Sequence, residues 1–419
     1  MDLQVETRLS ASVRGRTKRP YLERLVINVT HDCNLRCTYC YADTGAYGEA
    51  RGKLTAGVGE AIVDSFFSRF AQIRSIQLFG GEPFLNVRGI DGLCRHVARV
   101  AEREGAPMPQ FTTVTNGTLV NDAVIELIRT HNILVTVSLD GDRQVNDAHR
   151  VYAHGGGSFD RVVANIRKLK EATGQPVQIE GTFSSAHLAA GFSLAEFLRF
   201  VARDLGVRFV HMPWILGHEA YAGTGIEPTE ANVAALTQAY CEAISASLAS
   251  LESEDLAETV LLSTVESALR AELSGSASQP RTHICPAGSD TLSVGADGRV
   301  FPCFMFTNKA PFEFTRVHGF DDDVFDARRA EFVRQLEIPA DRNAGGFEMR
   351  AACAGHNYDV GGSISAMSAA QIRVQDAIDS HLRQVLGDIR ADEARWSWVQ
   401  CKLMLHQLES ASPFEAPTC

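Results

Sequence analysis

The stretch Leu25-Val-Ile-Asn-Val-Thr-His-Asp-Cys-Asn-Leu-Arg-Cys-Thr-Tyr-Cys-Tyr41 predicts a buried strand that runs directly into a cysteine-bearing loop. Its first part, up to Thr30, is mostly apolar and β-branched, as in a strand covered on both faces. Three thiolates on one loop can hold three irons of a cubane [4Fe-4S] cluster and leave the fourth iron open to a small molecule. A zinc site completed by a residue such as His31 is the alternative. The cysteines have the spacing C-x3-C-x2-C, at Cys33, Cys37 and Cys40.

This spacing, with an aromatic residue before the last cysteine, resembles the radical S-adenosylmethionine (SAM) superfamily. The resemblance implies that the open iron holds the amino and carboxylate groups of SAM. It also implies reductive cleavage of SAM to a 5′-deoxyadenosyl radical, which abstracts hydrogen from a substrate. The stretch Leu78-Phe-Gly-Gly-Glu-Pro-Phe-Leu85 follows a second predicted strand and matches the family's GGEP motif, which grips the methionine ammonium of SAM.

Polar residues at the ends of later strands complete the expected SAM site. Ser138 lies where the family places a ribose contact, and Arg150 lies where sulfatase-maturing relatives place a basic contact to the SAM carboxylate. A bidentate guanidinium suits a carboxylate, although a surface ion pair is the alternative for Arg150. The expected SAM contacts are Tyr39, Gly80, Gly81, Glu82, Asn116, Ser138 and Arg150. The catalytic acid or base stays unknown, because nothing ranks one proton acceptor among Asp140, Asp290, Tyr39 and His211.

Composition places the chain among ordinary globular proteins. It has 419 residues, of which 45% are hydrophobic and 22% charged, enough for one large domain and a smaller one. The net charge of −11 argues against a nucleic-acid footprint, and the basic run Arg14–Arg19 is expected to be a solvated tail. There is no signal sequence and no long apolar run, so we expect a cytoplasmic protein without a membrane segment. Its ten cysteines are then metal ligands or buried thiols rather than disulfides.

Strands and amphipathic helices alternate through the first two thirds of the chain. This pattern predicts an α/β fold with a parallel sheet, and six such units fit the partial (β/α)6 TIM-like barrel that the family resemblance also implies. The predicted strands are Leu25–Thr30, Ser75–Phe79, Gln110–Thr115, Leu134–Leu139, Val177–Phe183 and Val207–Met212. The predicted helices are Ala56–Phe70, Ile90–Glu104, Asp122–Thr130, Phe159–Ala172, Leu194–Leu205, Glu230–Glu252, Leu256–Leu273, Ser368–Leu386 and Asp392–Leu408.

A second region is expected after the hydrophilic break Ser274–Pro280. Asp297-Gly298 lies between alternating apolar runs and predicts a β-hairpin that returns Cys303 towards Cys285. This hairpin resembles the opening of a SPASM domain, an extension that carries auxiliary [4Fe-4S] clusters in peptide-modifying radical SAM enzymes. The expected domains are an N-terminal tail at 1–23, the partial barrel at 24–273, the SPASM-like region at 281–366, and C-terminal helices and tail at 367–419.

The SPASM-like region is short of cysteines. The family continues with a four-cysteine segment, of which only Cys353 survives here, where Arg350, Asp359 and Ser363 take the other positions. At most one auxiliary cluster is expected, with His283, His356 or Asp359 as substitute ligands, and a metal-free hairpin is the alternative. The candidate auxiliary ligands are Cys285, Cys303, Cys353 and Cys401, whereas Cys94 and Cys241 are expected to be core residues and Cys419 to lie in an unstructured tail.

The function favoured by these motifs is modification of a ribosomally made peptide, by a crosslink or a related C–H activation. Sulfatase-maturing relatives place an acidic residue after the second hairpin cysteine, where this chain has Phe304, which weakens a formylglycine-type activity. A radical SAM enzyme acting on a small molecule and a non-catalytic iron–sulfur protein are the competing functions. Expected partners are a precursor peptide, an electron donor such as flavodoxin or ferredoxin, and a separate leader-peptide-binding protein, because the 23 residues before the first strand are too few for such a domain.

Overall fold

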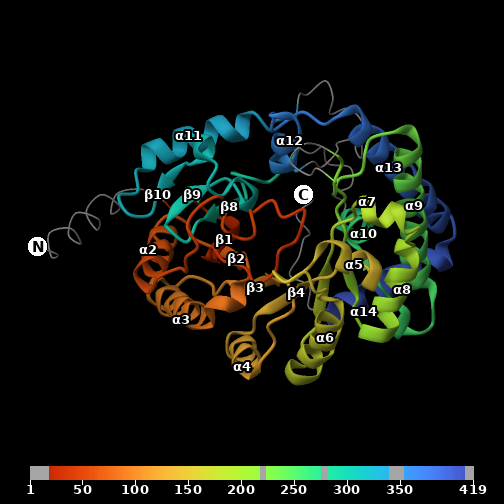
Figure 1. Cartoon of the computed structure of the whole chain (residues 1–419), viewed down its shortest axis with the longest axis horizontal. Helices are drawn as coiled ribbons and strands as arrows, with labels where there is room; N and C mark the ends of the chain where they lie inside the picture. Colours follow the sequence, from red (N-terminus) through yellow and green to blue (C-terminus); the bar gives the residue numbers. More distant parts are fainter. Residues whose placement is uncertain (1–17, 218–222, 275–281, 339–352, 411–419) are drawn as a thin grey trace, which may run out of the picture.

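A computed structural model describes residues 18–217, 223–274, 282–338 and 353–410. Arg350, Cys419 and most of the basic run 14–19 lie outside the described residues. The described chain forms one sheet surrounded by helices (Figure 1). Its strands are β1 Leu22–Thr30, β2 Ile73–Gly80, β3 Gln110–Thr115, β4 Leu134–Ser138, β5 Val177–Glu180, β6 Phe209–His211, β7 Leu261–Leu262, β8 Thr291–Val294, β9 Arg299–Phe301 and β10 Thr315–Arg316.

Helices follow most of the strands, as expected for a parallel sheet. They are α2 Ala56–Phe67, α3 Val87–Glu104, α4 Asp122–His131, α5 Arg143–His149, α6 Phe159–Thr173, α7 Ser185–Ala189, α8 Leu194–Leu205, α9 Glu230–Glu252, α10 Ser263–Ser274, α11 Asp322–Arg334, α12 Ala354–Gly361, α13 Ala369–Arg390 and α14 Glu393–Ser410. In the described chain, no helix is long and apolar enough to cross a membrane.

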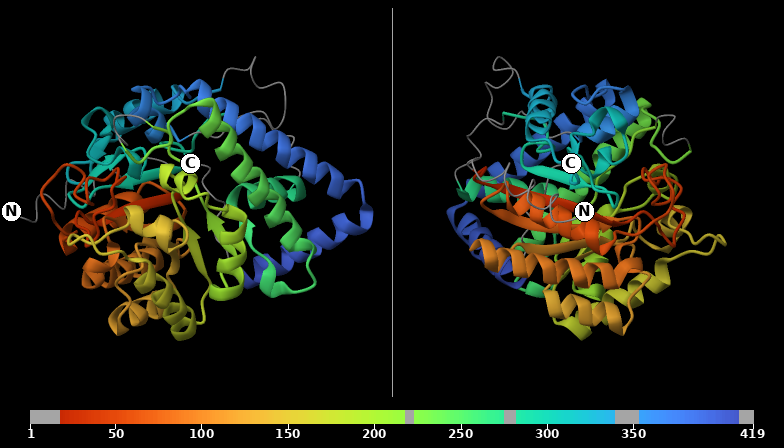
Figure 2. Two further views of the ribbon diagram at one scale, coloured as in Figure 1. Left: turned by 45° about the vertical axis from the view of Figure 1, so that its right-hand side comes forward. Right: turned by 90° about the vertical axis from the view of Figure 1, so that its left-hand side faces the viewer.

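The first six strands pair in sequence order and in parallel, β1 to β6, which confirms the α/β fold with a partial barrel. Alternate side chains of each strand point to opposite faces. In β1, Leu25, Ile27 and Val29 belong to the hydrophobic core shared with the outer helices. Arg24 and Asn28 therefore point to the inner face of the sheet, which Figure 2 shows curving between its helices.

The sheet extends beyond these six strands at both edges. The strand order is β10-β9-β8-β1-β2-β3-β4-β5-β6-β7 among the described residues. The predicted hairpin is present: β8 and β9 are antiparallel and turn at Gly298, whose φ of 83° suits glycine. Because β8 pairs with β1 in parallel, from Arg24 opposite Thr291 to Ile27 opposite Val294, the hairpin continues the barrel sheet. The division into domains stays a prediction.

One predicted helix is wrong. The range Leu256–Leu273 contains a short 3-10 turn, strand β7 and helix α10. Ser247 of α9 accounts for the break, because its hydroxyl donates to the carbonyl of Val260 and accepts from the amide of Leu262. The helices α5, α7, α11 and α12 were not predicted. The two C-terminal helices are present as α13 and α14, and both pack against α9 (Figure 1).

Candidate functional site

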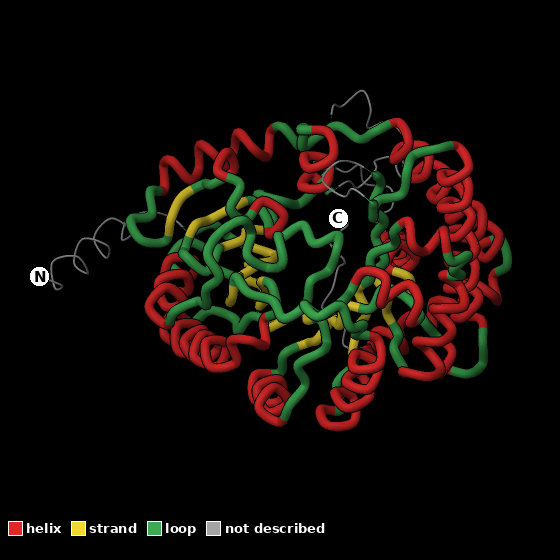
Figure 3. The backbone as a smooth tube through the Cα atoms, in the orientation of Figure 1, coloured by secondary structure: helices red, strands yellow, loops and turns green. Residues whose placement is uncertain are grey.

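The cysteine loop after β1 lies directly over the GGEP stretch at the end of β2. It belongs to the long connection between β1 and α2, drawn in green near the centre of Figure 3. The amide of Gly81 donates to the carbonyl of Thr30 at 3.2 Å, and the amide of Glu82 donates to the carbonyl of Asp32 at 2.8 Å. These backbone bonds hold the start of the cysteine loop against the second motif, as parallel pairing of β1 and β2 predicts.

Three glycines make this close approach sterically possible. A Cβ atom on Gly81 would lie 2.3 Å from the carbonyl oxygen of Asp32, and one on Gly80 would lie 2.2 Å from that of Thr30. On Gly45, a Cβ would lie 2.8 Å from the Cβ of Cys33. No side chain fits at such distances, because the neighbouring atoms belong to the backbone or to Cys33. Glycine is thus required here to pack the loop, in addition to any contact with a bound molecule.

The Glu82 carboxylate is buried and hydrogen-bonded within the protein. Its Oε1 accepts from the hydroxyl of Thr115 at 2.8 Å and from the amide of Phe84 at 3.0 Å, and its Oε2 accepts from the amide of Asn116 at 2.8 Å. The side chain is fully buried, and burial raises its pKa despite these bonds. Glu82 therefore ties the end of β2 to the end of β3.

The three thiols of the loop are close enough to influence one another. Burial, together with the neighbouring charges of Glu82, Cys37 and Cys40, raises the pKa of Cys33 to about 12. Burial likewise raises the pKa of Cys37 to about 11, whereas the charge of Arg150 lowers it. Thiolates in such a place require a strong positive partner, which iron supplies. The donor set thus fits a cluster, although the described residues contain no group of three metal-binding side chains already at coordination spacing.

Asn116 adds a polar contact to the first cysteine. Its amide Nδ2 donates to the Sγ of Cys33 at 3.7 Å and to the Oδ1 of Asn34 at 2.8 Å. Its Oδ1 in turn accepts from the backbone and hydroxyl of Thr118. Such an N–H···S contact stabilises a thiolate ligand. The structure therefore places Asn116 beside the cysteine loop, while Ser138 lies half-buried at the end of β4.

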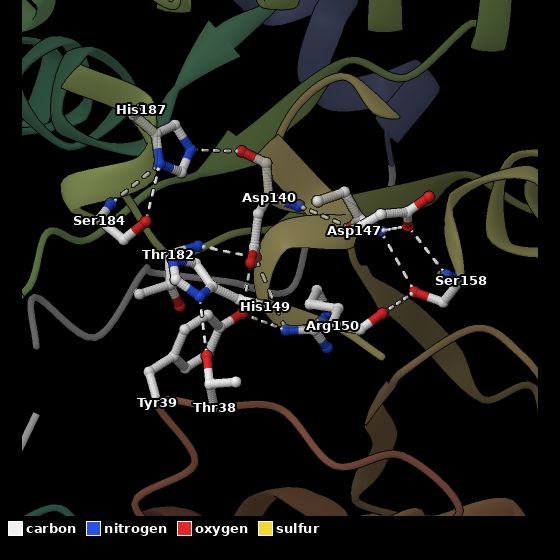
Figure 4. A network of polar contacts seen from close by, with 11 residues as sticks. Thr38, Tyr39, Asp140, Asp147, His149, Arg150, Ser158, Thr182, Ser184 and His187 are labelled. Atoms are coloured by element: carbon white, nitrogen blue, oxygen red, sulfur yellow. Dashed lines mark hydrogen bonds and ion pairs between the residues drawn. The ribbon is translucent and has the colours of Figure 1, made fainter. Parts of the chain in front are cut away.

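Arg150 belongs to a buried network rather than to a surface ion pair. Its Nη1 donates to the phenol oxygen of Tyr39 at 2.7 Å and lies 3.6 Å from Oδ1 of Asp140 (Figure 4). The phenol of Tyr39 donates to the Oδ2 of Asp140. Asp140 is fully buried and also accepts from the amide of Thr182 at 3.0 Å. The Nε of Arg150 has no hydrogen-bond partner among the described residues, so this guanidinium retains a donor for another group.

Backbone hydrogen bonds join the same loop to the end of α5 and the residues after it, a contact that the sequence did not predict. The amide of Thr38 donates to the carbonyl of His149 at 3.1 Å, and the amide of Arg36 donates to that of Val151 at 2.7 Å. The Thr38 hydroxyl contacts Nδ1 of His149 at 2.7 Å, and the Tyr39 ring meets the His149 ring edge to face (Figure 4). The segment around Cys37 is therefore held from two sides, by β2 and by α5.

A second group of cysteines lies around the hairpin that pairs with β1. Burial raises the pKa of Cys303 well above its usual range, and the charges of Cys285 and Cys353 add to the effect, so the three thiols lie together. Cys401 is not part of this group: its side chain is exposed on α14, a helix packed along α9. This corrects the four-cysteine expectation, because helix packing far along the chain was not visible in the spacing.

The three candidate substitute ligands, His283, His356 and Asp359, have different surroundings. Asp359 forms an ion pair with Lys309, and His283 lies in a β-bridge with Glu337. His356 follows Cys353 on the first turn of α12, and its backbone amide donates to the Sγ of Cys353 at 3.4 Å. Of the three residues, His356 is thus the one whose backbone contacts a cysteine of this group.

Aromatic side chains fill the space between the two cysteine groups. Burial raises the pKa of Tyr41, and the charges of both Cys40 and Cys303 contribute to the rise, so its phenol lies near each group. The Tyr41 ring packs against Phe304 at 6.2 Å between centroids, and Phe304 packs against Phe79 at 4.8 Å. Phe304 therefore has a packing role at the position where sulfatase-maturing relatives were expected to carry an acidic residue.

Comparison with known proteins supports this assignment of the loop. Residues 27–197 match the model of the radical SAM superfamily. The chain is 33% identical over 152 residues to a cysteine-type anaerobic sulfatase-maturating enzyme of Clostridium novyi, a match that covers 35% of this chain and 40% of that protein. It is 23% identical over 212 residues to the subtilosin biosynthesis protein AlbA of Bacillus subtilis, covering 50% and 43%. The chain thus spans less than half the length of these two relatives.

Solved structures share the fold over a larger part of the chain. The structure of native anSMEcpe with bound AdoMet has a TM-score of 0.71 at 16% identity and covers 89% of this chain and 100% of that one. Streptococcus suis SuiB bound to S-adenosylmethionine has a TM-score of 0.56 at 16% identity, covering 88% and 81%. Residues 27–197 thus match the radical SAM superfamily, whose enzymes use a [4Fe-4S] cluster and SAM, and the solved structures share the fold.

Proposed function

We propose that the protein modifies a ribosomally made peptide by radical chemistry. The observation that supports this proposal is a second group of cysteines, Cys285, Cys303 and Cys353, around the hairpin that pairs with β1, the strand that leads into the first group. A [4Fe-4S] cluster with SAM supplies the electron and the 5′-deoxyadenosyl radical when both are bound. A second metal centre next to it suits a reaction that removes an electron from the product, as in formation of a crosslink.

The residues of the chain have separate roles in this proposal. Cys33, Cys37 and Cys40 hold three irons of the first cluster, and the backbone of Gly80 and Gly81 faces the SAM ammonium. Arg150 offers its unpartnered Nε to the SAM carboxylate, while Tyr39 and Asp140 fix the orientation of its guanidinium. Cys285, Cys303 and Cys353 hold an auxiliary cluster, with His356 as the candidate fourth ligand.

A peptide or protein substrate is supported by the relatives. The matches include a sulfatase-maturating enzyme and a bacteriocin biosynthesis protein, and one matching structure is SuiB bound to the precursor peptide SuiA. Formylglycine formation is the second candidate, favoured by the similarity to the sulfatase-maturating enzyme. The aromatic packing of Phe304 disfavours it, because no carboxylate then follows Cys303 to take up a proton.

The test is iron content and SAM cleavage after anaerobic reconstitution. Wild type is compared with two triple variants, Cys33/Cys37/Cys40→Ala and Cys285/Cys303/Cys353→Ala. We expect each variant to lose about four irons and to keep the other cluster. Wild type should form 5′-deoxyadenosine with dithionite, and only the first variant should lose this product completely. Absence of 5′-deoxyadenosine from the wild-type reaction would refute radical chemistry, and an unchanged iron content in the second variant would refute the auxiliary cluster.

The substrate class is tested separately with peptides encoded next to the gene. Mass spectrometry of each peptide after incubation with reconstituted enzyme, SAM and dithionite should show loss of hydrogen atoms in at least one. Conversion of a cysteine or serine to formylglycine in a sulfatase peptide, with no change in any neighbouring-gene peptide, would replace the proposal by the second candidate.

A further inference from the structure

Arg24 is a buried cation without an anionic partner among the described residues. Its side chain is 7% exposed on the third residue of β1, and its guanidinium makes one long contact of 3.4 Å from Nη2 to the hydroxyl of Thr291. Its Nε has no partner in the described chain. No carboxylate of the described chain lies within ion-pair distance of it. A buried charge left in this state costs several kcal/mol, so proteins normally pair it.

Four other polar atoms without partners surround the same part of the sheet. They lie on the inner face of β8, β1, β2 and β3, because their sequence neighbours Leu292, Ile27, Ile76 and Phe111 belong to the helix-facing core. Ser293 and Gln77 both pair in register with Val26, and Gln77 also pairs with Thr112. The unpartnered atoms are Oγ of Ser293, Oδ1 of Asn28, Oε1 of Gln77 and Oγ1 of Thr112. We call these residues, with Arg24, the inner-face polar cluster.

The charge of Arg24 reaches into the middle of the inner face. Burial lowers the pKa of His211 on β6, and the positive charge of Arg24 lowers it further, whereas Glu180 on β5 raises it. The guanidinium therefore lies on the inner face of the sheet, within electrostatic reach of β6. Asn28, four residues nearer to the cysteine loop, contacts Thr307 beyond Cys303.

Buried polar groups in folded proteins are paired with protein, water or ligand. Here one cation, two amide groups and two hydroxyls face the same space with atoms that lack partners in the described chain. A guanidinium fork matches a carboxylate, and amides and hydroxyls match the N–H and C=O groups of a peptide main chain. We propose that the inner-face polar cluster binds a carboxylate of the substrate peptide, with Arg24 as the residue that recognises it. This inference rests on the proposed function and adds a substrate preference to it.

The carboxylate belongs to an acidic side chain or to the C-terminus of the peptide, and the experiment separates these sources. Three blocked tripeptides serve as probes: acetyl-alanyl-glutamyl-alanine amide, its glutaminyl counterpart, and acetyl-trialanine with a free carboxylate. Their binding to the reconstituted full-length protein with SAM is measured by ligand-observed NMR. We expect one carboxylate peptide to bind wild type on the order of tenfold more tightly than the glutaminyl peptide, because a charge-assisted bond replaces a neutral one.

Arg24→Met should abolish this preference, and Arg24→Lys should weaken it, because a lysine keeps the charge and loses the fork. Arg88→Met is the matched control, since it removes a positive charge from α3, on the outer side of the sheet, and should keep the preference. A wild-type protein that binds all three peptides equally, or a preference that persists in Arg24→Met, would overturn the inference.

Thermal stability separates recognition from a structural role. Because Arg24→Met removes an unpaired buried charge, we expect its melting temperature to equal or exceed that of wild type. A clear fall in melting temperature would show that Arg24 is structural and would contradict the inference. The proposed function fails independently, if wild type forms no 5′-deoxyadenosine. If wild type forms it and shows no carboxylate preference, only the present inference fails.

Discussion

Asp140 is the residue whose replacement tests the buried network most directly. Its carboxylate is fully buried, accepts from the phenol of Tyr39 and the amide of Thr182, and balances the charge of Arg150 at 3.6 Å. In Asp140→Asn, the amide oxygen can still accept from Thr182. The amide nitrogen cannot accept from Tyr39, and the Arg150 charge loses its counterion.

The expected cost follows from these losses. Breaking a buried ion pair by removing one partner costs about 3–5 kcal/mol, because the remaining charge stays buried. The lost bond between the Tyr39 phenol and a charged acceptor belongs to the same network, so its contribution of roughly 1.5–3 kcal/mol is partly included. We expect Asp140→Asn to lower the free energy of unfolding by about 3–5 kcal/mol. Because Tyr39 lies between Cys37 and Cys40, reconstitution should also yield less iron.

The assay is urea denaturation of the protein before reconstitution, followed by an iron determination after it. The matched variant is Asp140→Asn with Arg150→Met, which leaves neither charge buried. If the pair is coupled, the double variant should be more stable than Asp140→Asn alone. A loss below about 1 kcal/mol in Asp140→Asn would contradict this expectation. So would a double variant whose loss in free energy of unfolding equals the sum of the losses in Asp140→Asn and Arg150→Met, because the network would then carry no coupled charge.

The remaining contacts support three further predictions. Gly81→Ala should reduce iron incorporation severely, because its Cβ would lie 2.3 Å from the carbonyl oxygen of Asp32. The control Gly57→Ala, with nothing within 4 Å of its Cβ, should match wild type in iron per chain. Cys303→Ala should remove the auxiliary iron and Cys401→Ala should remove none in the same assay; equal losses would contradict the placement of Cys401 on an exposed helix face. Burial lowers the pKa of His187, so its neutral ring stabilises the fold above the unfolded-state pKa of about 6.5, and this stability is lost as the pH falls below that value. Urea midpoints measured between pH 7 and pH 5 should therefore fall less in His187→Asn than in wild type.

Several features of this protein are local in the sequence. The cysteine spacing, the glycine-rich turn after β2 and the Asp297-Gly298 hairpin depend on neighbouring residues, and they were predicted from the chain alone. The first six strands were also found, because apolar periodicity records which face of a strand or helix is buried. The break inside Leu256–Leu273 was missed, since a serine on α9, outside that segment, supplies the hydrogen bonds that end the helical pattern.

The sequence by itself thus indicated the similarity to the radical SAM superfamily and the candidate metal ligands. Only the tertiary structure decided which of those residues meet. It placed the hairpin beside β1, grouped Cys353 with the hairpin and left Cys401 exposed on α14. It also turned the Glu82 carboxylate inward and buried Arg24 without a counterion among the described residues. The physical reason is that burial and charge pairing depend on contacts between distant segments, and the spacing of residues along the chain does not record these contacts.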